Sequence, residues 1–171
     1  ERMADTLRAE QHLDVSHYHF QHFVLAHRRG DPAAMLLHAD ATWHHAHDAG
    51  DPWAEGLGLV ARARAMAAHG DWPSATQLLG RAQARVKGDA GSTIVYACLL
   101  ARAEWTFDVA NPDAGLPELR KLMQFARRKN IIFSNWERDE VMAELCVRAL
   151  EHGIETDFVR HLVSRRRLVP R

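Results

Sequence analysis

Apolar residues recur along the chain at spacings of three and four. Leu116, Leu119, Met123 and Ala126 show the pattern, and several other segments repeat it. This spacing places apolar side chains on one face of an α-helix. No stretch alternates apolar and polar residues over the length of a strand. The pattern therefore predicts an all-α fold.

Three strong breakers interrupt the pattern at intervals of about twenty residues. They are Gly30-Asp31-Pro32, Gly50-Asp51-Pro52 and Gly70-Asp71-Trp72-Pro73. Glycine ends a helix in the left-handed conformation, aspartate caps the next helix, and proline fits its first turn. With weaker breaks further on, the predicted helices cover about residues 2–29, 32–49, 53–69, 73–87, 91–109, 115–129, 132–152 and 155–167.

Short connections make consecutive helices antiparallel, so the eight helices should form four hairpins. These cover about residues 2–49, 53–87, 91–129 and 132–167, within one predicted domain of residues 1–171. Ala61-Arg62-Ala63 recurs as Ala101-Arg102-Ala103, forty residues later. A repeat of this period predicts an α-solenoid. Because the chain does not begin with Met, we expect it to be a fragment of a longer one.

The second hairpin resembles a tetratricopeptide repeat. Its matching residues are Ala63, Met66, Gly70-Asp71, Ala75, Leu79 and Ala82. The third hairpin keeps Ala103 and Leu119, but has Asn111-Pro112 at the turn and Gly115 in place of the alanine. The first and last match poorly, as terminal repeats often do. The resemblance implies a tetratricopeptide-like superhelix.

A second resemblance lies near the end of the chain, in the segments 149–155, 159–160 and 165–170. They are similar to part of the helical region of large bacterial transcription regulators of the MalT and LuxR-type ATPase group. The resemblance implies an ATPase module before the repeats, a DNA-binding domain after them, and repeats that sense an inducer or a partner protein. Leu168-Val169-Pro170-Arg171 also matches what thrombin leaves after cutting an engineered tag, and both interpretations stay open.

Charge and composition exclude several classes of protein. The chain has 22 Lys and Arg against 22 Asp and Glu, which argues against direct binding of nucleic acid. The longest apolar run, residues 94–101, is too short to span a membrane, and residues 1–5 do not begin a secretory signal. Cys98 and Cys146 cannot form a disulfide framework, so we expect a reducing, cytoplasmic location.

No enzyme motif is present. The sequence lacks GxxxxGK[ST], GxGxxG, GxSxG and HExxH. We therefore expect a non-catalytic chain without a cofactor, in which any ATPase activity belongs to another part of the regulator. A homo-oligomer is one alternative that the sequence leaves open, because solenoids often stack end to end.

Histidine is concentrated near the start of the chain. Nine of the twelve lie in the first fifty residues: His12, His17, His19, His22, His27, His38, His44, His45 and His47. His44, His47, Asp48 and Asp40 share a helix face, and His17 should lie opposite His44, which would suit zinc. Surface or core histidines are the favoured interpretation, so no metal is predicted. A response to mildly acidic pH is the other alternative.

Four arginines form the one dense basic patch of the sequence, at 160 and 165–167. Contact with phosphate is possible for such a patch. The favoured interpretation is a solvated last helical turn, where cations are stabilised by the helix dipole.

Repeat proteins bind partners on the concave surface lined by the first helix of each hairpin. The forty-residue register predicts a mixed polar and apolar groove there for a peptide or a small effector. Its candidate residues are His17, Arg64, Glu104, Glu137, Glu140 and Glu144. Salt bridges that join neighbouring hairpins are the alternative role of these residues. At the level of the whole chain, a free-standing peptide-binding scaffold and a His-rich metal- or pH-sensing module are the alternatives to a sensor domain.

Overall fold

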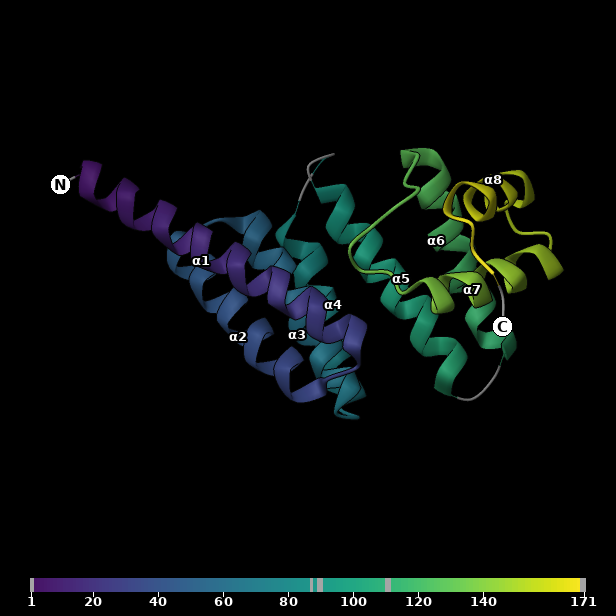
Figure 1. The fold of residues 1–171 in the computed structure, drawn as a ribbon, viewed down its shortest axis with the longest axis horizontal. Helices are drawn as coiled ribbons and strands as arrows, with labels where there is room; N and C mark the ends of the chain where they lie inside the picture. The colour runs from purple at the N-terminus through teal and green to yellow at the C-terminus, as the bar shows by residue number, and fades with distance from the viewer. Residues whose placement is uncertain (1, 87, 89–90, 110–111, 170–171) are drawn as a thin grey trace. The chain divides into compact units, whose positions relative to one another are not determined.

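The computed structural model describes residues 2–86, 88, 91–109 and 112–169. Within these ranges the chain is all-α, as predicted, with no strand (Figure 1). The elements are α1 (Arg2–Arg29), α2 (Pro32–Ala49), α3 (Pro52–Ala68), α4 (Trp72–Arg85), α5 (Ser92–Val109), the 3₁₀ turn η2 (Pro112–Gly115), α6 (Leu116–Lys129), α7 (Asp139–Glu151) and α8 (Thr156–Arg166). Asn111, Pro170 and Arg171, which carry parts of the sequence predictions, lie outside the described residues.

The three Gly-Asp breakers act as predicted. Gly50 ends α2 with a φ of 68°, which a residue with a side chain rarely adopts. Asp51 then caps α3, because its Oδ1 accepts a hydrogen bond from the Ala54 N–H at 2.7 Å. Asp31 and Asp71 cap α2 and α4 in the same way. Hydrogen bonds from the Ser74 side chain and backbone lower the pKa of Asp71.

The described helices fall into two compact units, residues 1–94 and 95–171. The boundary between them lies inside α5. The prediction of one domain over residues 1–171 stays a prediction. No helix among the described residues is both long enough and apolar enough to cross a bilayer.

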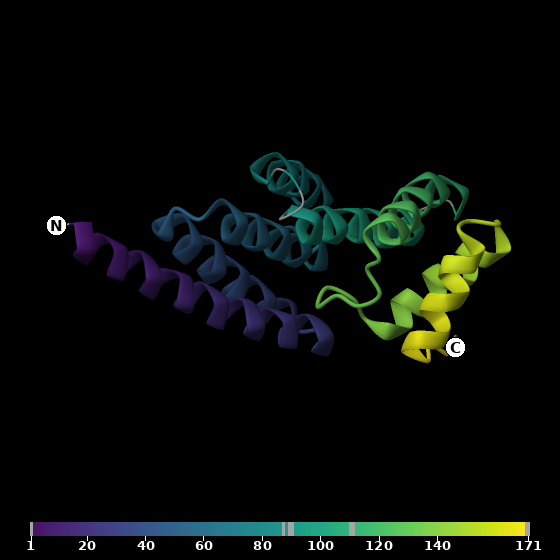
Figure 2. The ribbon, with the colours of Figure 1, turned by 90° about the horizontal axis from the view of Figure 1, so that it is seen from above.

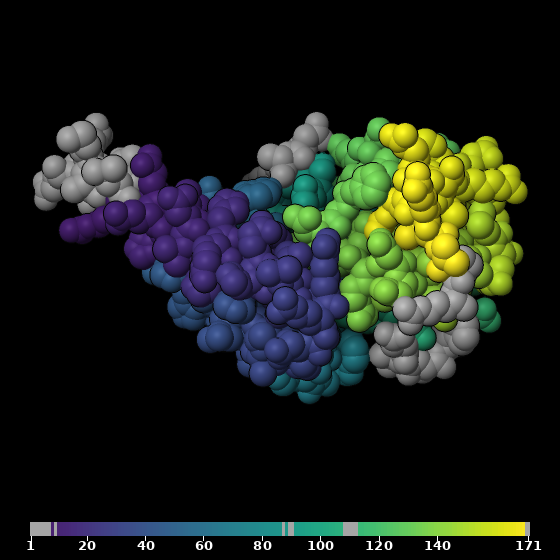
Figure 3. Space-filling model, viewed as in Figure 1, coloured from purple at the N-terminus to yellow at the C-terminus, as the bar shows by residue number. Residues whose placement is uncertain are grey.

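In the first unit each helix packs against the next one in the chain. α1 contacts α2, α2 contacts α3, and α3 contacts α4, while α1 also reaches α3 (Figure 2). The side chains of α1 form much of the surface that this unit turns to the viewer in Figure 3 (purple). α3 lies between α2 and α4, and every residue from Ala54 to Ala61 is buried. This central helix positions the residues of the groove described below.

The second unit consists of the rest of α5 with α6, α7 and α8. α6 contacts both α7 and α8, and α7 contacts α8. Its core contains Trp136 and Leu119, whose side chains are almost fully buried.

The predicted helix over residues 132–152 begins later than expected, at Asp139. Asn130 ends α6 in the left-handed conformation with a φ of 52°, and residues 131–138 form an irregular segment. This segment carries Trp136, which is 1% exposed, and the buried Glu137 into the core. Burial of these two side chains is a tertiary effect, which helical periodicity does not report.

Candidate functional site

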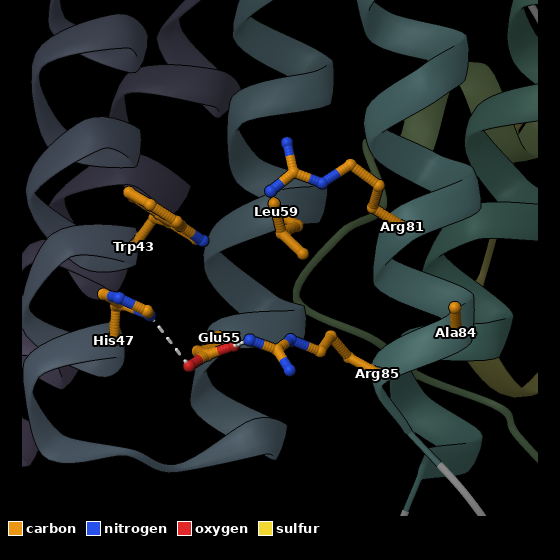
Figure 4. Close-up of a pocket in the computed structure, with 7 residues that line it drawn as sticks. All are labelled: Trp43, His47, Glu55, Leu59, Arg81, Ala84 and Arg85. Carbon is orange, nitrogen blue, oxygen red and sulfur yellow. Dashed lines mark hydrogen bonds and ion pairs between the residues drawn. The ribbon is translucent and has the colours of Figure 1, made fainter.

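A groove of about 290 Å³ lies between α2, α3 and α4 of the first unit. It is lined by Trp43, His47, Glu55, Leu59, Arg81, Ala84 and Arg85. Figure 4 shows Trp43 and His47 on α2, Glu55 and Leu59 on α3, and two arginines that extend from α4 toward α3. This volume is near the lower limit for sites that hold a small molecule.

One wall of the groove is aromatic and held in place by its neighbours. The rings of Trp43 and His47 stack with their centroids 5.2 Å apart. The Arg62 guanidinium lies 4.9 Å from the centroid of the Trp43 ring, and its Nε pairs with Asp40 at 2.8 Å. Gly58 of α3 has no side chain, which allows the α2 backbone at Trp43 to approach closely. The indole therefore presents a preorganised flat surface.

The charges of the groove do not cancel. Glu55 is buried, and its carboxylate pairs with Arg85 and with Nδ1 of His47, the latter at 3.2 Å. Arg81 is exposed and has no ion-pair partner among the described residues. With Glu55 matched by Arg85, the remaining positive charge of the groove is the Arg81 guanidinium. A guanidinium and an indole that line the same groove suit a ligand that has an anionic group and a flat or apolar body.

The two predicted concave-face residues of the first unit differ in burial. His17 is exposed on α1, with its ring centroid 6.1 Å from that of Trp53. Arg64 of α3 is 3% exposed, and its Nη1 lies 3.4 Å from Nε2 of His27. Neither residue lines the groove.

The four predicted residues of the second unit also divide into two kinds. Glu104 and Glu137 are buried, whereas Glu140 and Glu144 are exposed, one turn apart on α7. Three of the six predicted residues are buried and contribute little to an open surface. They are Arg64, Glu104 and Glu137. A role of the six in binding stays a prediction.

Glu137 takes part in a buried polar network of the second unit. Its carboxylate accepts a hydrogen bond from the Tyr96 hydroxyl and pairs with Arg166, which also pairs with Asp139. Burial, followed by the nearby Glu137 carboxylate, raises the pKa of Tyr96 well above its ordinary value. Burial also raises the pKa of the neighbouring Cys146 thiol to about 12.

The prediction of a fully solvated basic patch is therefore wrong for one of its four arginines. The Arg166 side chain is 5% exposed. Burial alone would lower its pKa, but the carboxylates of Glu137 and Asp139 raise it above the ordinary value. The guanidinium is thus retained in the interior by two carboxylates, whereas Arg160, Arg165 and Arg167 are exposed as predicted.

The structure groups the N-terminal histidines differently from the sequence prediction. His12 lies opposite His45, with 3.1 Å between their Nδ1 atoms, and His19 lies opposite His38 at 3.0 Å. These two pairs define the antiparallel register between α1 and α2. In this register residue 13 lies opposite His44, one turn away from His17. His44 instead places its Nδ1 2.8 Å from the Asp40 carbonyl oxygen. The predicted arrangement around His17 and His44 is therefore wrong.

The two histidines of the second pair, His19 and His38, have lowered pKa values. Burial, followed by the charges of neighbouring imidazoles, lowers the pKa of His19. Burial and His22 lower the pKa of His38. Both shifts favour the neutral form of the imidazole, while a response of the whole His-rich segment to acid stays a prediction.

No sequence motif identifies Trp43 and Arg81 as residues of one groove, because they come from different helices. The histidine pairs did leave a trace in the sequence. His12 and His19 are seven residues apart, as are His38 and His45, so each set returns to one helix face after two turns. Comparison with known proteins adds no further assignment: no protein-family model, no curated protein and no solved structure matches the chain.

Proposed function

We propose that this chain is a tetratricopeptide-like sensor domain that binds an inducer or a partner protein without catalysing a reaction. Its ligand occupies the groove between α2, α3 and α4 and carries a carboxylate or phosphate group. The observation that carries this proposal is the Arg81 guanidinium, which has no ion-pair partner in the described part of the chain and lies in a groove whose opposite wall is the Trp43 indole. The ligand is either a small inducer or a partner protein, and the groove volume of about 290 Å³ favours a small anionic inducer.

The packing of α3 and α4 supports the tetratricopeptide-like part of the proposal. Ala63 on α3 and Ala75, Leu79 and Ala82 on α4 are fully buried. Small residues at helix crossings and a Gly-Asp turn between the helices are the features on which the resemblance depends. In this arrangement the groove uses both helices of one hairpin and the last helix of the preceding one.

Binding would act on the rest of a regulator through differential affinity. A ligand that contacts α2, α3 and α4 together stabilises the arrangement in which these helices form the groove. If the resting and active forms of a MalT-like regulator differ in that arrangement, the inducer shifts the balance between them.

The binding part is tested by nuclear magnetic resonance. Small organic carboxylates and phosphates are titrated into the protein, and acidic peptides are titrated separately. The indole N–H signal of Trp43, assigned with a Trp43→Phe variant, should move with a small anion. Arg81→Gln should weaken that binding by about tenfold or more, because it removes a charged hydrogen-bond donor.

The matched control is Arg120→Gln, which removes an exposed arginine of α6 in the other unit. It should bind as the unchanged protein does. Equal binding by Arg81→Gln, or no shift of Trp43 with any anion, would reject the groove as the site. A response to acidic peptides alone would favour the scaffold alternative.

The regulator part has a separate test in the open reading frame that encodes the chain. We expect a GxxxxGK[ST] motif upstream and a DNA-binding pattern downstream. A frame without both would reject the regulator and leave the groove to be judged by its own experiment.

A further inference from the structure

The paired histidines of α1 and α2 form a row of imidazoles along one side of the first hairpin. His12 faces His45, and His19 faces His38, one pair two turns away from the other. The rings of His19 and His45 stack with an interplanar angle of 1° and centroids 6.0 Å apart. Asp48 extends the row, because it follows His45 by three residues on the same face of α2.

At one end of this row, three possible ligand atoms converge. Nδ1 of His12 lies 3.1 Å from Nδ1 of His45 and 4.0 Å from Oδ2 of Asp48. One ligand atom from each of the three residues lies within 4.8 Å of the other two. Zinc bonds of about 2.0–2.2 Å place neighbouring ligand atoms of a tetrahedral site about 3.3–3.6 Å apart. Small rotations of the side chains therefore suffice to bring all three onto one ion.

The backbone beneath these residues is firmly held. The Ser16 hydroxyl, buried between the helices, donates a hydrogen bond to the Thr42 carbonyl at 2.9 Å. Ala39 and Ala46 of α2 are fully buried, and their small side chains let the helices approach. The ligand-bearing helices are thus preorganised, which reduces the entropy lost when an ion binds.

An ion can reach the site from solvent. The side chains of His12 and Asp48 are 38% and 55% exposed. Two imidazoles and one carboxylate are a donor set suited to zinc and to other divalent metals late in the first transition series. A three-residue site leaves a coordination position for water or an added ligand.

We propose that His12, His45 and Asp48 bind one divalent transition-metal ion, with zinc as the ion that best fits this donor set. The ion links α1 to α2 near the open end of the hairpin, opposite the Gly30-Asp31 turn. Because such an ion binds the folded hairpin and not the separated helices, it stabilises this part of the chain. The site shares no residue with the groove, so the inference does not depend on the proposed function.

The experiment titrates zinc into the metal-free protein and follows the heat of binding and the melting temperature. Cobalt serves as a second probe, because its visible absorption reports nitrogen and oxygen ligands directly. We expect one tight site per chain and a rise in melting temperature with zinc. His45→Gln and Asp48→Asn should each weaken zinc binding by at least about tenfold, since loss of an outer-shell partner alone costs about 10- to 100-fold.

The matched control is His44→Gln, the neighbouring exposed histidine on α2, whose ring bonds to its own helix. It should bind zinc as the unchanged protein does. Asp48 is exposed, so Asp48→Asn remains informative even if His45→Gln fails to fold. Equal zinc binding by Asp48→Asn, an equal loss in His44→Gln, or no saturable site in the unchanged protein would overturn the proposal.

Discussion

Gly58 of α3 lies directly against the backbone of Trp43 in α2. A Cβ atom added to Gly58 would stand 2.6 Å from Cα of Trp43 and 2.9 Å from its backbone N. Real Cβ atoms do not approach backbone so closely, so the two helices meet here at a distance that only glycine permits. The same contact sets the position of the Trp43 indole in the groove.

Gly58→Ala should therefore destabilise the chain. Neither backbone can move away without disturbing α3, which is buried along this stretch. We expect the free energy of unfolding to fall by about 1–3 kcal/mol, as for other overpacked cores. Denaturant unfolding followed by circular dichroism measures the change.

Gly80→Ala is the matched control for this variant. Gly80 lies within α4, and nothing comes within 4 Å of its added Cβ. The same substitution there should raise the free energy of unfolding by about 0.5–1 kcal/mol, since alanine favours the helix. Equal effects at the two positions would contradict the close contact.

Helix boundaries were predictable wherever the cause was local. The caps at Asp31, Asp51 and Asp71 depend on residues next to one another in the chain, so their signals are complete in the sequence. The segment before α7 was not predictable in this way. Its course is determined by burial of Trp136 and by the pairing of Glu137 with Arg166, which come from distant parts of the second unit.

The candidate sites depend on contacts between helices, which the sequence shows only in part. The composition drew attention to the histidines, and their seven-residue spacing was visible. The pairing of His12 with His45 required the register between α1 and α2, in which an error of one turn selected His17 and His44 instead. The groove had no local signal, because Trp43, Glu55 and Arg81 come from three helices.

Removal of the Arg166 guanidinium should lower the free energy of unfolding strongly. Arg166→Met leaves the Glu137 carboxylate, in a residue that is 4% exposed, without its cationic partner, while the hydrogen bond from the Tyr96 hydroxyl remains. Breaking a buried pair from one side costs about 3–5 kcal/mol. Denaturant unfolding should show a loss in this range for the variant.

Arg165→Met is the control for this loss, because Arg165 is exposed on the same helix turn. Its effect should stay within about 0.5 kcal/mol. The double variant Glu137→Gln/Arg166→Met should recover part of the stability, since the buried charge is then absent. A loss in Arg166→Met no larger than that in Arg165→Met would show that the network contributes little.

The cap of α3 gives a third prediction. Asp51→Ala removes the acceptor of the Ala54 N–H and should lower the free energy of unfolding by about 0.5–2 kcal/mol. Asp51→Asn keeps a side-chain oxygen at this position and should remain close to the unchanged protein. Thermal unfolding compares the two variants, and an equal loss in both would assign the effect to charge and not to capping.

The last prediction concerns alkaline pH. Burial and the Glu137 carboxylate raise the pKa of Tyr96 well above 10.0, so the folded chain keeps this proton where the unfolded chain releases it. Above pH 10 the unfolded state then binds fewer protons, and the free energy of unfolding falls as the pH rises, by up to about 1.4 kcal/mol per pH unit. Tyr96→Phe should make this fall shallower, whereas Tyr18→Phe, at an exposed ring, should leave it unchanged. Denaturant unfolding at several pH values between 9 and 11 measures the slopes, and equal slopes for Tyr96→Phe and the unchanged protein would contradict the altered acidity of Tyr96.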